Sequence, residues 1–161
     1  MNSTKEMIDI EVEAMVENDL EEVLRIERLS FSTPWSRQAF LDELRNKEFS
    51  RMIIARACDR NIYKGILGYC CYWIICDEVH ITNMAAHNRY RRKGIGEKLL
   101  RHVIEEAKKM KSRLLTLEVR SSNLKAQALY QKFGFKAVTI RKKYYSDPRE
   151  DALVMLLELK E

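Results

Sequence analysis

The sequence has little of the material that separates domains. It contains only 5 glycines and 2 prolines in 161 residues, and it has no repeat and no low-complexity run. Without such segments, nothing marks a linker between two folded units. Hydrophobic residues make up 46% of the chain, which is enough to fill one substantial core. We therefore expect a single domain over residues 1–161, with residues 1–7 flexible.

Metal-binding and disulfide patterns are missing as well. The 4 cysteines occur between positions 58 and 76 without a Cys-x-x-Cys pair, and the 3 histidines lack a ligand spacing. No apolar run reaches the roughly 18 residues needed to span a bilayer, and the N-terminus does not resemble a secretory signal. We expect no metal site, reduced and buried cysteines, no membrane contact and a cytoplasmic location. His80, His87 and His102 are interpreted as surface or boundary residues rather than catalytic bases.

The net charge does not decide which class of ligand the protein binds. Lys and Arg outnumber Asp and Glu by 29 to 24, which gives a formal net charge of +5. A mildly basic surface suits an acidic cofactor, but it equally serves solubility, so it does not by itself indicate nucleic-acid binding. We expect no requirement for nucleic acid, and we favour a monomer.

Hydrophobic periodicity predicts alternating strands and helices. Period-two or continuous apolar runs predict strands at residues 8–12, 52–57, 66–75, 78–86, 114–120, 136–145 and 151–159. Period 3.6 predicts helices that begin near residues 18, 36, 95 and 123. Asn18 and Asn123 are the predicted N-terminal caps, and Gly134 is the predicted stop of the last helix. The apolar stripes of the first and third helices are expected to include Leu29 and Met110.

A basic loop with two glycines precedes the third helix. It runs from Arg89 to Lys98, with Gly94 and Gly96 at the helix start. A helix N-terminus carries unpaired N–H groups and roughly half a positive charge, so it suits phosphate oxygens. Glycines let a ligand approach the backbone, and the flanking cations raise the local potential. The loop matches neither the Walker nor the dinucleotide motif, and a merely solvated helix start is the alternative.

An acidic residue lies inside a strand in the C-terminal third. Glu118 shares one face of the strand with Thr116 and Arg120, because side chains alternate along a strand. The simplest interpretation is a carboxylate paired with Arg120. In the following helix, Tyr130 falls on the inward face, where core packing is its simplest role.

Three segments resemble the GCN5-related N-acetyltransferase superfamily, and within it the bacterial ribosomal-protein-alanine N-acetyltransferases of the RimI type. The spacing Arg91-x-x-Gly94-x-Gly96 is similar to the superfamily's pyrophosphate loop. The run from Leu117 to Phe135 carries the pattern Leu-Glu-Val-Arg-x-Ser-Asn, and Phe-Ser-x-Pro-Trp-Ser at residues 31–36 is similar to the loop beside the acceptor.

The resemblance implies an α/β fold with a mixed, largely antiparallel sheet and helices on both faces. It implies acetyl-CoA as co-substrate, bound by Met84, Ala85, Ala86, Arg91, Arg92, Lys93, Gly94, Ile95, Gly96, Glu97 and Asn123. In place of the Asp-Pro often found in the family, this chain has His87-Asn88, so the start of the loop is expected to differ locally.

The resemblance also implies a chemistry. Glu118 matches the proton acceptor and Tyr130 the proton donor of a direct transfer in a ternary complex. Phe31, Trp35 and Tyr144 are implied walls of the acceptor groove, although Phe31 and Trp35 are alternatively pins between helices. The implied acceptor is the N-terminal alanine of a small-subunit ribosomal protein. Lysine side chains, polyamines or drug amines are alternatives, as is a non-enzymatic ribosome-associated module that senses acyl-CoA.

Overall fold

The computed structural model of the chain describes residues 7–160, so the expectation for residues 1–6 lies outside the described residues. The strands are β1 Ile10–Ala14, β2 Ser50–Ala57, β3 Ile66–Ile75, β4 Glu78–Ala86, β5 Leu114–Arg120, β6 Lys136–Ser146 and β7 Arg149–Glu158. The helices are α1 Leu20–Ser30, α2 Arg37–Arg45, α3 Ile95–Lys109 and α4 Leu124–Lys132, with 3₁₀ turns η1 Glu17–Asp19 and η2 Asn88–Tyr90.

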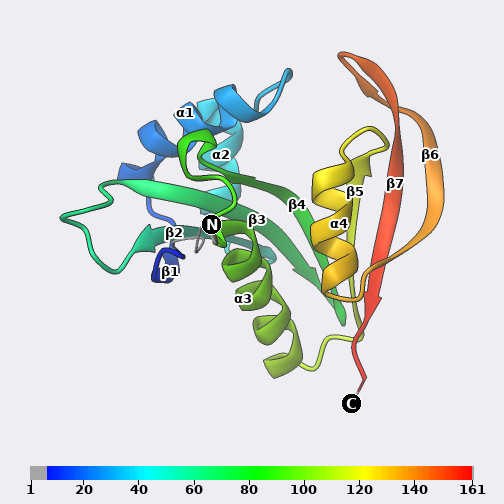
Figure 1. Cartoon of the computed structure of the whole chain (residues 1–161). Coiled ribbons are helices and arrows are strands. Elements are labelled where there is room, and N and C mark those ends of the chain that lie inside the picture. The colour runs from blue at the N-terminus through cyan, green and yellow to red at the C-terminus, as the bar shows by residue number, and fades with distance from the viewer. Residues whose placement is uncertain (1–6, 161) are drawn as a thin grey trace, which may run out of the picture.

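The seven strands form one sheet in the order β1-β2-β3-β4-β5-β7-β6 (Figure 1). Five of the six neighbouring pairs are antiparallel, and β4 and β5 run parallel. A parallel pair needs a long crossover, which α3 supplies between these two strands. The expected mixed, largely antiparallel sheet is therefore confirmed.

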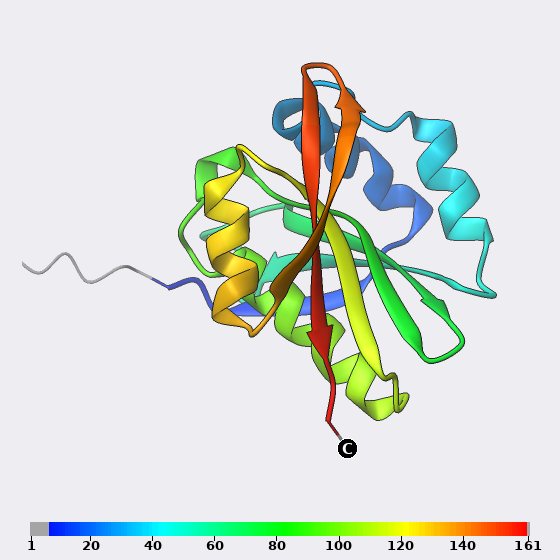
Figure 2. The same ribbon diagram turned by 90° about the vertical axis from the view of Figure 1, so that its right-hand side faces the viewer.

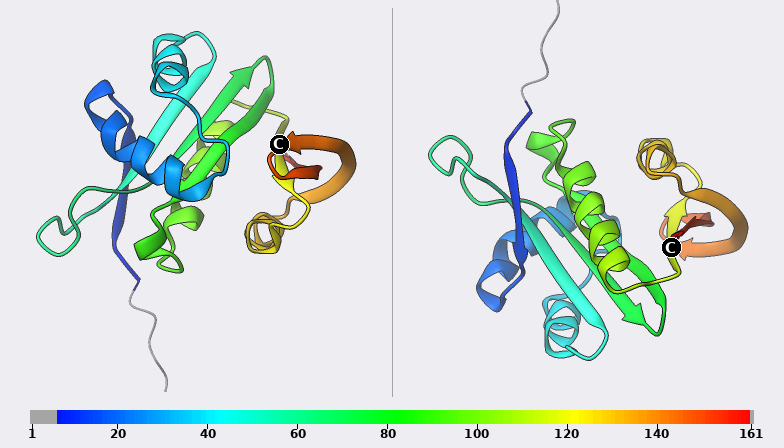
Figure 3. Two further views of the ribbon diagram at one scale, coloured as in Figure 1. Left: turned by 90° about the horizontal axis from the view of Figure 1, so that it is seen from above. Right: turned by 90° about the horizontal axis from the view of Figure 1, so that it is seen from below.

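Helices cover both faces of the sheet, as expected. α1 and α2 lie on one face, and α3 and α4 lie on the other (Figure 3). The central strand β3 serves both layers, because its neighbouring side chains point to opposite faces. Cys70 belongs to the core beneath α3, and Cys71 belongs to the core beneath α1 and α2. Such a strand reads as a continuous apolar run, since it is buried on both sides.

The start of the first helix differs from the prediction. Asn18 does not cap an α-helix, because it lies inside the 3₁₀ turn that precedes α1. The neighbouring Asp19 provides the side-chain contact at this turn, because its Oδ2 accepts a hydrogen bond of 2.8 Å from the backbone N–H of Val16. Asp19 also pairs with Arg56 of β2, whose Nη2 lies 2.7 Å from its Oδ1, a contact between residues far apart in the sequence.

Two apolar residues expected on inward helix faces are exposed. Leu29 is 56% exposed and Met110 is 45% exposed. In α1 the last inward positions belong instead to Ile26 and Glu27, which lie one turn earlier on the face against the sheet. Met110 follows the last residue of α3, so it no longer continues the helical stripe.

The cysteines divide into two classes. All four are free; Cys70 and Cys71 are buried, as expected, whereas Cys58 and Cys76 are exposed because they follow the ends of β2 and β3. Residues 7–160 contain no group of His, Cys, Asp and Glu side chains that could hold a metal ion. Within the same residues, every helix is too short or too polar to cross a bilayer.

Candidate active site

β4 and β5 separate half-way along their length. They pair only as far as Ile81 and Leu117, and beyond this point they diverge (Figure 1). On its other side, β4 stays paired with β3 up to Ala86. Met84, Ala85 and Ala86 therefore have one edge of β4 without a β5 partner. An extended polar chain can bond along such an edge like an added strand, which fits the binding role expected for these residues.

The loop before α3 has a backbone shaped for an anion. Gly94 precedes the helix at φ 83°, and Arg92 also lies in the left-handed region at φ 63°. Left-handed residues turn neighbouring N–H groups toward one side, and such concavities bind anions. A non-glycine residue there costs of order 1 kcal/mol, so the surrounding fold must enforce it. Gly94 makes no side-chain cap, which leaves the first N–H groups of α3 open.

Gly96 has a second role beyond the expected access to the backbone. A Cβ at this position would lie 3.1 Å from Cδ2 of Leu129, so the glycine lets α4 pack closely against the start of α3. The next residue strengthens the same contact, because the Glu97 carboxylate pairs with Lys132 of α4 at 2.5 Å. The loop therefore holds α4 as well as presenting its own backbone.

α4 carries two of the expected site residues. Asn123 is its N-terminal cap, as expected, since its Oδ1 accepts the N–H of Ala126 at 3.2 Å. Tyr130 is 7% exposed, and its ring lies 5.7 Å from the ring of Phe135. Burial raises the pKa of Tyr130, so the phenol keeps its proton at neutral pH. Tyr130 thus belongs to the core and still carries a proton that it can donate.

Glu118 does not pair with Arg120. The ion pair that the sequence pattern predicted between these two residues is therefore wrong. Its Oε2 lies 3.0 Å from Nε2 of His80, and its Oε1 lies 3.5 Å from Nη1 of Arg141. Arg120 instead contacts Glu150 at 3.3 Å. His80, which the sequence suggested to be a surface or boundary residue, is therefore part of the site.

Opposing effects set the pKa of Glu118. Burial raises it, but the hydrogen bond and charge of His80, together with the charge of Arg141, lower it further than burial raises it. The pKa thus falls below its ordinary value, and the carboxylate is ionised at neutral pH. Ionisation is the state that a proton acceptor needs.

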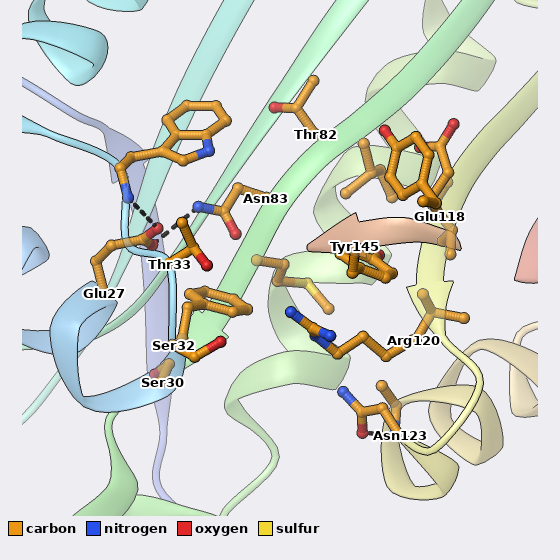
Figure 4. A pocket seen from close by; sticks show the side chains of 18 of the residues that line it. Glu27, Ser30, Ser32, Thr33, Thr82, Asn83, Glu118, Arg120, Asn123 and Tyr145 are labelled. Atoms are coloured by element: carbon orange, nitrogen blue, oxygen red, sulfur yellow. Dashed lines mark hydrogen bonds between the residues drawn. The ribbon is translucent and has the colours of Figure 1, made fainter. Parts of the chain in front are cut away.

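A cavity of about 460 Å³ joins these elements (Figure 4). Seven of the expected site residues lie in its wall: Met84, Glu118, Asn123, Tyr130, Phe31, Trp35 and Tyr144. The other expected coenzyme residues, Ala85, Ala86 and residues 91–97, lie beyond this wall, on β4 and at the start of α3. A second cavity of about 320 Å³ shares five lining residues with the first, namely Trp35, Thr82, Glu118, Tyr144 and Tyr145, so Glu118 borders both cavities.

Glu27, which the sequence analysis overlooked, fixes one wall of the cavity. It is 1% exposed and accepts hydrogen bonds from the backbone N–H of Trp35 at 2.9 Å and from Asn83 Nδ2 at 2.8 Å (Figure 4). It also accepts a hydrogen bond from the Tyr69 hydroxyl. Burial raises the pKa of Glu27, although the hydrogen bonds from Trp35 and Asn83 oppose that rise. The sequence did carry a signal for this residue, because Glu27 follows Val23 by four positions and is therefore a charged residue on the apolar stripe of α1.

The three aromatic residues expected at the acceptor groove differ in their packing. Trp35 packs on Phe40 with ring centroids 5.3 Å apart, and it also lines the cavity, so it serves as pin and wall together. Phe31 is 36% exposed and lines the cavity, so it is not a core pin. Tyr144 is 49% exposed and borders both cavities.

Arg120 anchors the hairpin of β6 and β7 on the opposite wall. Its guanidinium donates to the carbonyl oxygens of Asp147 and Pro148, each at 2.9 Å, and lies 4.2 Å from the ring centroid of Tyr145. Ser32, in the loop after α1, donates to the same Asp147 carbonyl. The hairpin tip and this loop therefore meet (Figure 2), and Ser32 and Ser146 line the cavity at this point.

Comparison with known proteins places this architecture. Residues 20–135 match the model of the Acetyltransferase (GNAT) family. The chain belongs to this family. The expected fold, the N-acetyltransferase activity and acetyl-CoA as co-substrate are thereby confirmed. The open edge of β4 and the uncapped start of α3 are the parts of this GNAT chain that fit the coenzyme's extended arm and its phosphates.

Individual relatives of this GNAT chain cover nearly its whole length. A Bacillus subtilis (strain 168) protein assigned as a [ribosomal protein bS18]-alanine N-acetyltransferase is 39% identical over 143 residues, covering 89% of this chain and 91% of that protein. The Escherichia coli (strain K12) enzyme of that name is 31% identical over 150 residues, covering 92% and 97%. The crystal structure of the ribosomal-protein-S18-alanine N-acetyltransferase from Escherichia coli superposes with a TM-score of 0.83 at 30% identity, covering 94% and 95%. The expected resemblance to the ribosomal-protein-alanine group is confirmed.

Proposed function

We propose that this chain acetylates the N-terminal α-amine of a small-subunit ribosomal protein, with the N-terminal alanine of bS18 as the first candidate. The named activity of relatives at 31–39% identity supports the acceptor. The observation that carries the proposal is Glu118, an ionised carboxylate only 10% exposed, in the wall of a cavity that reaches from the coenzyme edge to the acceptor loop.

The type of acceptor follows from the cost of removing a proton. An α-amine has a reference pKa near 8 and a lysine near 10.4, and each unit of pKa is worth about 1.4 kcal/mol. Deprotonating a lysine at neutral pH therefore costs roughly 3 kcal/mol more than deprotonating an N-terminus. A single carboxylate that acts through a water molecule suits the α-amine better.

Two residues divide the proton chemistry. Glu118 accepts the proton that the ammonium loses, by way of water, and releases it to solvent. The amine nitrogen then forms a bond to the acetyl carbonyl carbon, and the bond from that carbon to sulfur breaks. Tyr130 donates its phenolic proton as the thiolate departs, which requires proton transfer to be coupled to departure because the reference pKa of a phenol is about 10 and that of a thiol about 8.5. The new amide nitrogen releases its second proton, and the Tyr130 phenolate takes up one proton in return, so the products are the amide and the free thiol.

Direct transfer in a ternary complex is favoured over an acyl-enzyme. Cys70 and Cys71 are fully buried, and burial raises the pKa of both thiols, so neither supplies a thiolate. Cys58 and Cys76 lie outside the cavity wall. We propose a monomeric enzyme that acts in the cytoplasm, where ribosomal proteins are made, and that needs neither nucleic acid nor a metal.

The test is to incubate the protein with acetyl-CoA and peptides, and to locate the acetyl group by fragmentation mass spectrometry. A peptide with the N-terminal sequence of bS18 should gain one acetyl group on its α-nitrogen. The matched control is the same peptide with a formylated N-terminus and free lysines, which should remain unmodified. Acetylation of the lysines, or of a polyamine alone, would assign a different acceptor. Modification of none of them, with acetyl-CoA bound, would favour an acyl-CoA sensor.

A further inference from the structure

His80 and Glu118 meet because of the register of β4 and β5. His80 is the direct partner of Thr116 in the parallel ladder, and Glu118 lies two residues beyond Thr116 on the same face. The last paired residues are Ile81 and Leu117, so the two strands separate one residue after His80. His80 is thus the last paired residue of β4 on this face, and Glu118 is the first residue of β5 to enter the gap.

The imidazole of His80 is held from three sides. Nδ1 lies 2.7 Å from the Thr116 hydroxyl, and Nε2 lies 3.0 Å from Oε2 of Glu118. Its ring lies 6.0 Å from the ring of Trp73, whose Nε1 donates to Glu43 at 2.9 Å. Because an ionised carboxylate only accepts, the imidazole donates from Nε2 to Glu118, and its contacts with Thr116 and Trp73 fix the orientation of the ring.

We propose that His80 is a positioning residue for the acetyl transfer, holding Oε2 of Glu118 so that the carboxylate keeps one orientation toward the amine. The inference rests on the proposed role of Glu118 as proton acceptor. His80 itself does not line the larger cavity and reaches it only through Glu118. It lines the smaller cavity behind Glu118, on the side away from the coenzyme.

The other contact to Glu118 is a weaker constraint. Arg141 is 54% exposed on β6, and its Nη1 is 3.5 Å from Oε1, so a mobile side chain provides it. Tyr145, also on β6, faces the same carboxylate, and the charge of Glu118 helps burial and Tyr144 to raise the pKa of Tyr145 to about 12. A neutral phenol does not replace the His80 contact, for which the structure gives the shortest distance to Glu118.

Substitutions at His80 separate positioning from packing. His80→Phe keeps a flat ring against Trp73 but removes the donor, whereas His80→Gln keeps a neutral donor of similar reach. We expect the turnover number of His80→Phe to fall about tenfold at neutral pH, which is less than the roughly 10²-fold cost of a 1 Å misplacement, because Arg141 still contacts Glu118. His80→Gln should recover most of that loss. Acetyl-CoA affinity should stay unchanged in both variants.

The pH profile gives a second measurement. His80 and Arg141 lower the pKa of Glu118, so removing His80 should raise that pKa. The acidic limb of kcat/KM should therefore move to higher pH in His80→Phe, and less so in His80→Gln. Thr116→Val keeps the imidazole but removes the partner of Nδ1, so it should produce a smaller shift in the same direction.

The same pKa can be measured without turnover. Carbon-13 NMR titration of the Glu118 carboxyl in the free protein should give a higher pKa in His80→Phe than in the wild type. An unchanged Glu118 pKa together with wild-type turnover would overturn the proposal, as would equal defects in His80→Phe and His80→Gln. If the wild type acetylates no peptide, the proposed function fails, whereas the NMR titration still decides whether His80 controls Glu118.

Discussion

The two halves of the proposed site offer different chemical groups to their ligands. The coenzyme half consists of the edge of β4, the loop before α3 and the start of α4, and it offers mainly backbone groups. The acceptor half is assembled from side chains of α1, the loop after it, β5 and the hairpin of β6 and β7. Backbone recognition requires particular local conformations, so it leaves a short motif in the sequence. Side-chain recognition depends on which distant segments the fold brings together.

The forces that hold the two halves differ accordingly. On the coenzyme side, Gly94 and Arg92 adopt left-handed conformations within a single loop. On the acceptor side, Glu27 accepts hydrogen bonds from β3, from β4 and from the loop after α1, and Arg120 donates to two carbonyl oxygens of the hairpin turn. The contrast predicts that coenzyme-side variants change acetyl-CoA affinity, whereas acceptor-side variants change turnover or stability.

The largest effect is expected where the two halves meet, at Glu118. Glu118→Gln keeps the shape but cannot accept a proton, so turnover at neutral pH should fall by about 10² to 10⁴. Because α-amines lose their proton near pH 8, much of this loss should be recovered as pH approaches that value. Acetyl-CoA affinity, measured by calorimetry, should barely change. Wild-type turnover across this range would reduce Glu118 to a structural partner of His80.

Substitution of the buried Tyr130 separates a packing role from a role as proton donor. Tyr130→Phe keeps the ring beside Phe135, so a packing role predicts near-normal activity. A proton donor predicts about a 10²-fold loss of turnover with intact coenzyme binding. Steady-state kinetics with an acyl donor whose thiol is more acidic should restore the variant relative to the wild type, because departure then needs less protonation. Equal defects with both donors would remove Tyr130 from the acid role.

The difference between the halves also explains what the sequence could predict. Elements with strong periodicity were predicted nearly to the residue, as for β3, β4 and β5. The cap at Asn123 and the stop at Gly134 follow from local backbone rules and were right. The partner of Glu118 was wrong, because choosing between Arg120 and His80 requires the register of β4 on β5.

Glu27 provides a stability test on the acceptor half. Glu27→Ala leaves the donors of Trp35, Tyr69 and Asn83 without their acceptor, and we expect it to lower the free energy of unfolding by about 3 kcal/mol. Urea denaturation measures this, with the exposed Glu21→Ala in the same helix as control, expected to change stability by about 0.5 kcal/mol or less. A loss no larger than that of the control would mean that Glu27 does not hold the loop.

The pH dependence of that loss has a defined sign. The folded pKa of Glu27 is raised above its ordinary 4.5, so its contribution to stability is fully present below the unfolded pKa. The contribution declines as pH rises through the folded pKa. Repeating the denaturation at pH 5 and pH 8 should therefore give the larger difference between wild type and Glu27→Ala at pH 5. The opposite order would mean that the carboxylate, rather than the neutral acid, is the form stabilised by folding.

The smallest effect is expected in the coenzyme half, where a comparison of two Gly94 variants separates the effect of charge from that of backbone strain. Gly94 has φ 83°, a conformation that Asn and Asp tolerate better than other non-glycine residues. Gly94→Asn and Gly94→Asp are nearly isosteric, and a Cβ at this position meets first the end of the exposed Met7 side chain, which can move. The Asp variant alone adds a negative charge at the start of α3, where phosphates are expected. Calorimetry should therefore show acetyl-CoA binding about tenfold weaker in Gly94→Asp than in Gly94→Asn, because like charges repel at close range. Equal affinities would mean that the phosphates bind elsewhere, and the backbone account of the coenzyme half would then be wrong.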